Sequence, residues 1–191
     1  LVDDHLDLIK LKPFLVILQN EQNKQIKKEA SKVISKIAKR NPSSIKPVMA
    51  VILQSLNQQE SSVKIVLSKS LLEIAKETPD LIPIRPIINL LTDEDSFIRE
   101  IATKILGYLG YKAPEEITDV LINDALLDDE WIVRESAVIS LGAIIQHTKE
   151  KEVIIKKLVG LLDDQQAWVR RSALNILSEI KELKASQVPF D

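Results

Sequence analysis

A single helical pattern occurs five times along the 191 residues of this chain. In each copy a Val or Ile, here called the anchor, precedes a Lys or Arg, and apolar or small residues follow four, eight and eleven positions after the anchor. That spacing is typical of one face of an α-helix and not of a strand. The anchors are Ile26, Val63, Ile98, Val133 and Val169, which gives periods of 37, 35, 35 and 36 residues. So regular a period predicts a repeat protein.

A second apolar segment precedes each copy of the pattern, so each repeat is predicted to be a helical hairpin. The predicted first helices cover residues 6–18, 45–56, 81–91, 115–127 and 152–162. Neither helix of a hairpin can bury its apolar stripe alone, so neighbouring hairpins must stack. We therefore expect an all-α fold, a right-handed α-solenoid of five stacked helical hairpins in a single domain. The expected repeats are residues 1–40, 41–77, 78–112, 113–148 and 149–184, with a tail at 185–191.

Composition supports helices and excludes several classes of site. Four glycines and 4% aromatic residues are too few for a sandwich or barrel. The chain has no cysteine, which excludes disulfides, thiolate zinc sites and cysteine nucleophiles and fits a reducing compartment. No apolar run reaches the roughly 18–20 residues that cross a bilayer, and the acidic start does not read as a secretory signal. These features predict a soluble, cytoplasmic protein without membrane insertion.

Three repeats share a polar signature at the turn between their two helices. An Asp stands five residues before the anchor and an Arg directly follows it, in the pairs Asp93 and Arg99, Asp128 and Arg134, and Asp164 and Arg170. We expect each Asp to accept hydrogen bonds from N–H groups at the helix start. We expect each Arg to reach an Asp or carbonyl of the neighbouring repeat, which would make a structural ladder. The first two repeats depart from the signature, with Glu21 and Lys27, and with Gln58 and Lys64.

These turns resemble those of HEAT repeats, in which an acid precedes Val or Ile followed by Arg. Prolines in the first helices are a further HEAT habit, here Pro13, Pro47, Pro83 and Pro86. The resemblance to the HEAT and armadillo family covers nearly the whole chain. It implies an α-solenoid whose second helices line a concave face. The signatures of tetratricopeptide and ankyrin repeats are absent.

The sequence offers little for catalysis. His5 and His147 are isolated, and neither a GxGxxG, a P-loop nor a GxSxG motif occurs. We therefore expect no catalytic residue, no cofactor and no metal site, and we interpret the acidic clusters around Asp93 and Asp128 as capping groups. The resemblance leaves enzyme alternatives open, because some HEAT-like proteins are lyases for tetrapyrrole attachment and others are DNA glycosylases.

The predicted concave face takes the residues two, six, ten and thirteen positions after each anchor. Partner contact is predicted there for Lys28, Lys32, Lys36, Lys69, Lys104 and Tyr108. Residues 1–76 contain 13 Lys and Arg against 7 Asp and Glu, a charge of +6, whereas residues 77–191 carry 13 against 21, a charge of −8. This asymmetry favours an acidic partner segment near the basic half, or end-to-end packing with a second copy. A merely solvated lysine face is the alternative.

Two function classes follow from this surface. The first is a non-enzymatic scaffold that binds a peptide or helix of a protein partner along the concave face. The alternative is nucleic-acid binding through the basic half, which the acidic remainder of the chain disfavours. A lyase built on the same frame comes third. The aromatic residues Phe97, Trp131 and Trp168 stand next to anchors, and burial between hairpins is favoured for them over partner contact.

Overall fold

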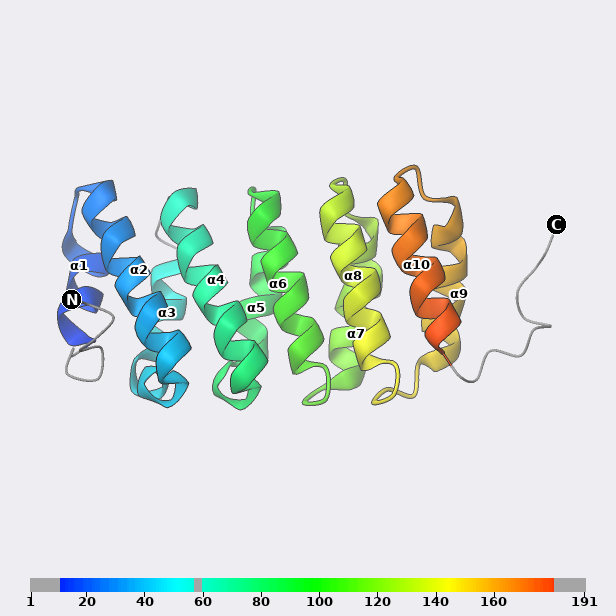
Figure 1. The fold of residues 1–191 in the computed structure, drawn as a ribbon, viewed down its shortest axis with the longest axis horizontal. Helices are drawn as coiled ribbons and strands as arrows, with labels where there is room; N and C mark the ends of the chain where they lie inside the picture. Colours follow the sequence, from blue (N-terminus) through cyan, green and yellow to red (C-terminus); the bar gives the residue numbers. More distant parts are fainter. Residues whose placement is uncertain (1–10, 57–59, 181–191) are drawn as a thin grey trace. The chain divides into compact units, whose positions relative to one another are not determined.

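Helices begin where the sequence supplies caps and prolines. The Asn23 side chain accepts hydrogen bonds from the N–H groups of Gln25 and Ile26 at the start of α2 (Lys24–Arg40). Pro114 is the first residue of α7 (Pro114–Asn123), where a missing N–H costs nothing. The computed structural model describes residues 11–56 and 60–180, and these ranges contain helices and no strand (Figure 1). The helices fall into two units, Leu1–Leu90 and Leu91–Asp191, here called unit 1 and unit 2.

Unit 1 contains two helical hairpins and the first helix of the third. Its second helices, α2 and α4, pack side by side (Figure 1). Side chains such as Leu18, Ile34 and Leu67 are fully buried in its core, and each contributes about 1.5–3 kcal/mol of hydrophobic stabilisation. The remaining elements are α1 (Lys12–Asn20), η2 (Pro42–Val48), α3 (Met49–Leu56), α4 (Ser61–Glu77), η3 (Pro79–Leu81) and α5 (Ile84–Asn89).

Unit 2 contains the second helix of the third repeat and two complete hairpins. The second helices α6, α8 and α10 pack in that order, and each first helix packs against the second helix of its own hairpin. The short helix η4 (Leu90–Thr92) spans the boundary between the units. The other elements are α6 (Ser96–Leu109), η5 (Ala125–Leu127), α8 (Trp131–Ile144), α9 (Lys151–Gly160), η6 (Leu161–Asp163) and α10 (Ala167–Glu179), together with α7.

The all-α repeat fold is confirmed, but the predicted first helices are too long. The predicted helix over residues 81–91 is divided into η3, α5 and η4. The backbone is extended at Ile82 and Pro83, because the residue before a proline is disfavoured in a helix, whereas Pro86 lies in the first turn of α5, where a missing N–H costs little. Among the described residues the first helix covers Lys12–Asn20, and residues 6–10 of its predicted range lie outside them. His5, Gln58 and the predicted tail at 185–191 lie outside those residues. The single domain stays a prediction.

Four of the five anchors are buried as predicted: Val63, Ile98, Val133 and Val169 are at most 1% exposed. The prediction is wrong for Ile26, which is 44% exposed. Ile26 belongs to the first hairpin, which no other hairpin precedes among the described residues. Within the same residues, no helix is both long and apolar enough to cross a membrane.

Candidate functional site

The turns of unit 2 are joined by two bidentate ion pairs. The Arg99 guanidinium donates from Nε to Asp128 Oδ2 at 2.7 Å and from NH2 to Asp128 Oδ1 at 2.8 Å. Arg134 holds Asp164 of the next repeat in the same way, at 2.8 and 3.0 Å. All four side chains are largely buried, with exposures between 8% and 16%. A planar guanidinium matches a carboxylate in this geometry, so each pair fixes the position of one hairpin on the next.

The third guanidinium nitrogen of each arginine, NH1, makes two contacts in its own turn. Arg99 NH1 donates to the carbonyl oxygens of Asp93 and Glu94, and Arg134 NH1 donates to those of Asp128 and Asp129. Each arginine therefore closes its own turn and also holds the next one.

The turn aspartates bind the backbone one step earlier than the sequence predicts. The Oδ1 atoms of Asp93, Asp128 and Asp164 accept hydrogen bonds from the N–H groups of Asp95, Glu130 and Gln166. The three residues that donate these N–H groups are the N-cap residues of α6, α8 and α10, so the turn aspartates order the turn and do not cap the helices themselves. In α6 that task falls to Asp95, which accepts from the Phe97 N–H.

The ladder shifts the pKa values of its members. Burial raises the pKa of Asp128, but hydrogen bonds from Arg99 and the Glu130 N–H, together with the arginine charges, outweigh burial and leave the pKa below its ordinary value. For Asp164 the hydrogen bonds from Arg134 are the largest influence, and they lower the pKa against the opposing effect of burial. The paired aspartates raise the pKa values of Arg99 and Arg134. Both ion pairs are therefore fully charged at neutral pH.

These shifts predict that acid weakens unit 2. A carboxylate whose pKa is lower in the folded state stabilises the fold above the ordinary aspartate pKa of about 3.9, and this contribution is lost as pH falls through the lower, folded value. We expect the difference in the free energy of unfolding between the wild type and Asp164→Asn to be largest at neutral pH and to shrink below about pH 4. Denaturant titrations over a pH series measure it. Asp163→Asn, on an exposed neighbour, is the control, and an Asp164→Asn difference that did not change with pH would contradict the assignment.

The last arginine of the series, Arg170, makes the contacts within its own turn but not those to a following repeat. Its NH1 donates to the carbonyl oxygens of Asp164 and Gln165, as in the other turns. Among the described residues no carboxylate binds its Nε and NH2 atoms, and the side chain is exposed. The donor edge that Arg99 and Arg134 use for the next repeat is open here.

The predicted partner-binding lysines of unit 1 lie on the outward face of its second helices. Lys32 and Lys36 of α2 and Lys69 of α4 are exposed, and Lys28 is half-buried. Acidic side chains lie among these lysines: Glu29 binds Lys32 at 2.8 Å, and Glu73 binds Lys76 at 2.7 Å and approaches Lys39 at 3.9 Å. The hydrogen bond from Lys76 is the main reason that the pKa of Glu73 is lowered. The face is basic, with its charge partly compensated.

The corresponding face of unit 2 has a different chemistry. Lys104 is half-buried and forms an ion pair with Glu100, whose side chain is 11% exposed. Tyr108 is exposed two turns along α6 from Glu100, with Tyr111 beyond it, and Ile139 is exposed on α8. Glu135 accepts a hydrogen bond from the Ser172 hydroxyl at 2.9 Å. This face is largely neutral, with exposed aromatic and aliphatic side chains.

The prediction of burial is wrong for two of the three aromatic residues. Phe97 and Trp168 are 56% and 54% exposed, whereas Trp131 is half-buried. Phe97 and Trp168 directly precede their anchors, and one residue along a helix turns the side chain by about 100° away from the buried face. The Arg171 guanidinium lies over the Trp168 ring at 5.6 Å, a cation–π arrangement.

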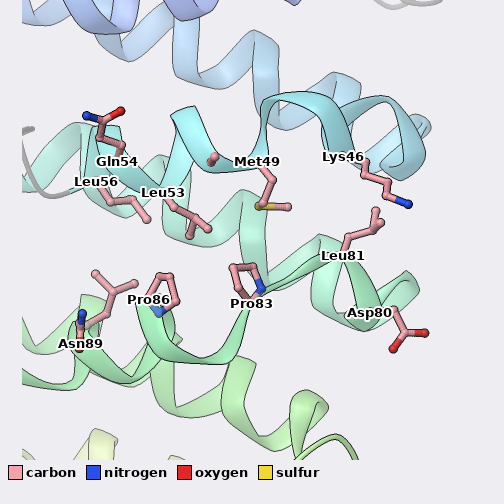
Figure 2. A pocket seen from close by; sticks show the side chains of 12 residues that line it. Lys46, Met49, Leu53, Gln54, Leu56, Asp80, Leu81, Pro83, Pro86 and Asn89 are labelled. Carbon is pink, nitrogen blue, oxygen red and sulfur yellow. The ribbon is translucent and has the colours of Figure 1, made fainter.

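Unit 1 also has a groove on the side of its first helices, which the sequence did not predict. The groove lies between α3 and α5 and encloses about 730 Å³. Figure 2 shows Met49 and Leu53 on one side and Pro83 and Pro86 on the other. Lys46 and Asp80 lie at one end of the groove. The walls of the groove are therefore largely apolar.

Solved structures with the same arrangement of helices are repeat proteins. A designed armadillo repeat protein in complex with the peptide (KR)4 superposes with a TM-score of 0.69 and 15% identity over 93% of this chain and 84% of that one. The archaeal HEAT-like repeats protein from Thermococcus onnurineus NA1 gives a TM-score of 0.62 and 16% identity over 93% of this chain and 74% of that one. The chain is a repeat protein of the HEAT/armadillo fold. Its HEAT-type hairpins carry the turn ladder described above.

Two further comparisons bear on the HEAT-type repeats. Residues 97–189, just under half of the chain, match the family described as Cnd1, non-SMC mitotic condensation complex subunit 1. The complex of CpcE and CpcF of phycocyanin lyase from Nostoc sp. PCC7120 gives a TM-score of 0.64 and 18% identity over 87% of this chain and 96% of that one. No curated protein matches the chain in sequence.

Proposed function

We propose that the chain is a non-enzymatic scaffold that binds an acidic peptide or helix of a protein partner on the second helices of unit 1. The observation that carries this proposal is the exposed lysine face, with Lys32, Lys36 and Lys69 projecting from neighbouring helices α2 and α4. Helices that pack side by side present a row of charges at intervals of about 8–10 Å. An extended acidic segment has carboxylates at a comparable spacing, so it can meet successive rows.

The comparisons support a binding role of this general kind. A designed armadillo protein of the same fold holds a peptide of Lys and Arg, which shows that the fold can bind a highly charged segment. The lysine face of unit 1 is basic, like that peptide, so it favours an acidic ligand. The match to a subunit of the condensation complex also supports a place in a protein assembly. A cytoplasmic location belongs to the same proposal, supported by the absence of cysteine.

The neutral face of unit 2 supplies a different kind of contact. Tyr108 and Ile139 are exposed and lie on the neighbouring helices α6 and α8. Aromatic and aliphatic side chains of this kind are common at the centres of protein interfaces. Lys104, with its charge compensated by Glu100, contributes less to an acidic ligand than the lysines of unit 1 do.

Binding of a labelled peptide of Glu and Leu residues, measured by fluorescence anisotropy, tests the proposal. We expect the triple variant Lys32→Glu, Lys36→Glu, Lys69→Glu to weaken binding by about tenfold or more, because each reversed charge costs up to about 1 kcal/mol. The matched control reverses three exposed lysines of first helices, Lys12, Lys156 and Lys157, and should bind as the wild type does.

The same titration with labelled double-stranded DNA distinguishes nucleic-acid binding, the second candidate function, from peptide binding. The lysine face is the observation that favours nucleic acid, because lysines that neutralise phosphates make binding fall steeply with salt. Tight, salt-dependent DNA binding that the first triple variant abolishes, with no binding of the acidic peptide, would replace the scaffold proposal.

A further inference from the structure

In unit 2, α6 and α8 each contact the next second helix through the same three positions, here called the stripe. The stripe takes the positions one, five and nine residues after the anchor, which are Arg99, Thr103 and Gly107 in α6 and Arg134, Val138 and Gly142 in α8. Arg99 and Arg134 bind the next turn aspartate, and Thr103 and Val138 are fully buried. The Thr103 carbonyl accepts a hydrogen bond from the Ser140 hydroxyl of α8 at 3.0 Å. At the glycines the next helix approaches so closely that a Cβ would contact Ser140 or Ile176.

On α10 the equivalent positions are uncovered, with a serine in place of the glycine. The residues at these positions are Arg170, Leu174 and Ser178, and all three are exposed. Leu174 is 58% exposed, although Val138 at the equivalent position of α8 is 0% exposed. The described residues provide no hairpin beyond α10. This face therefore has an arginine and an apolar residue at the positions that contact the next hairpin in α6 and α8, but no hairpin covers them.

The first hairpin of unit 1 has the complementary half of such a contact. Glu21 stands five residues before the anchor, as Asp128 and Asp164 do, and its Oε1 accepts a hydrogen bond from the Asn23 N–H at 2.8 Å, the same turn bond that the aspartates make. Its Oε2 has no partner among the described residues, whereas Asp128 and Asp164 each bind an arginine with the equivalent atom. The anchor Ile26 is also the one that is exposed.

We propose that chains of this protein associate head to tail, with the α10 stripe of one copy seated on the first hairpin of another. In this contact the Arg170 guanidinium binds the Glu21 carboxylate, and Leu174 covers apolar surface of α2. Equivalent positions in unit 2 support a second pair: Ser172 of α10 bonds Glu135 of α8, and the corresponding positions of the new contact place Arg171 opposite Glu29.

The charge of the two ends favours a second copy as the occupant. Residues 1–76 carry +6 and residues 77–191 carry −8, so unlike halves of two copies attract one another over a distance. A contact between different surfaces of identical chains leaves one binding surface free at each end of a dimer, so further copies can add and the products are rings or open oligomers. Glu29 also binds Lys32 of the lysine face, but Arg170, Leu174 and Glu21 lie outside that face, so variants of these three residues test the association separately from peptide binding.

Sedimentation velocity of the full chain tests the proposal. We expect the mean mass to rise with protein concentration and to fall with added salt, because the contact includes exposed ion pairs. Arg170→Glu and Glu21→Arg should each raise the apparent dissociation constant by about tenfold or more, and an equimolar mixture of the two variants should associate again, since every contact then joins opposite charges.

Leu174→Glu provides a test that leaves the turn bonds of Arg170 intact. It should also prevent association, whereas Leu127→Glu, on an exposed leucine of η5, should not. A wild type that sediments as a monomer at every concentration would overturn the proposal. Association that persists in Leu174→Glu would overturn it as well, because the contact would then lie elsewhere.

Discussion

Replacing Arg134 with Ala will lower the melting temperature of the chain by roughly 4–8 °C, corresponding to about 2 kcal/mol of lost stability. The variant loses both bonds to Asp164 and both bonds to the carbonyl oxygens of its own turn. It also leaves the Asp164 carboxylate, which is 8% exposed, without its cation. Leaving a partly buried carboxylate without its hydrogen-bonded cation is more costly than the pair itself is favourable.

Arg170→Ala is the matched control for Arg134→Ala. Arg170 makes the same bonds to its turn but binds no carboxylate among the described residues, so the melting temperature should fall by less than half as much. The double variant Arg134→Ala, Asp164→Ala measures the pair directly, and we expect a coupling of about 1–3 kcal/mol. Equal effects of Arg134→Ala and Arg170→Ala would show that the turn bonds matter and the bonds between repeats do not.

Gly107→Ala will destabilise unit 2 by about 1–3 kcal/mol, although alanine is the better helix former. An added Cβ at Gly107 would lie 2.6 Å from Ser140 Oγ and 3.2 Å from Ser140 Cα. A rotation of the Ser140 side chain cannot relieve the contact with the Ser140 backbone, so α6 and α8 must move apart. The hydrogen bond from the Ser140 hydroxyl to the Thr103 carbonyl, at 3.0 Å, would be lost with that movement.

Gly160→Ala tests whether packing is the cause. Gly160 also lies at the end of a helix, α9, but an added Cβ there meets nothing within 4 Å. The substitution should therefore raise the free energy of unfolding by about 0.5–1 kcal/mol, from helix propensity alone. Urea denaturation measures both variants. If Gly107→Ala were as stable as the wild type, the close approach of α6 and α8 would not contribute to the free energy of unfolding.

The candidate surfaces differ in how far the sequence could predict them. Lys32 and Lys69 were assigned to an exposed helix face from their offset to the anchors, and the structure exposes both. The uncovered stripe on α10 was not found, although the repeat alignment places Leu174 opposite Val138. The signal was an apolar residue at the equivalent position, which is exposed because no hairpin covers it among the described residues.

Local spacing was enough to predict the period, the hairpins and the buried face of each second helix, apart from the exposed anchor Ile26. Val133, Ala137, Leu141 and Ile144 are all at most 1% exposed, because a spacing of 3.6 residues places them on one face of a helix. The sequence also indicated that each arginine contacts the next repeat, but the contacts themselves needed the tertiary structure: Arg134 binds the Asp164 carboxylate with two hydrogen bonds, glycines let α6 and α8 approach, and a groove lies between α3 and α5. Those contacts depend on the distance and rotation between helices, which are set by the packing of side chains far apart in sequence and not by local periodicity.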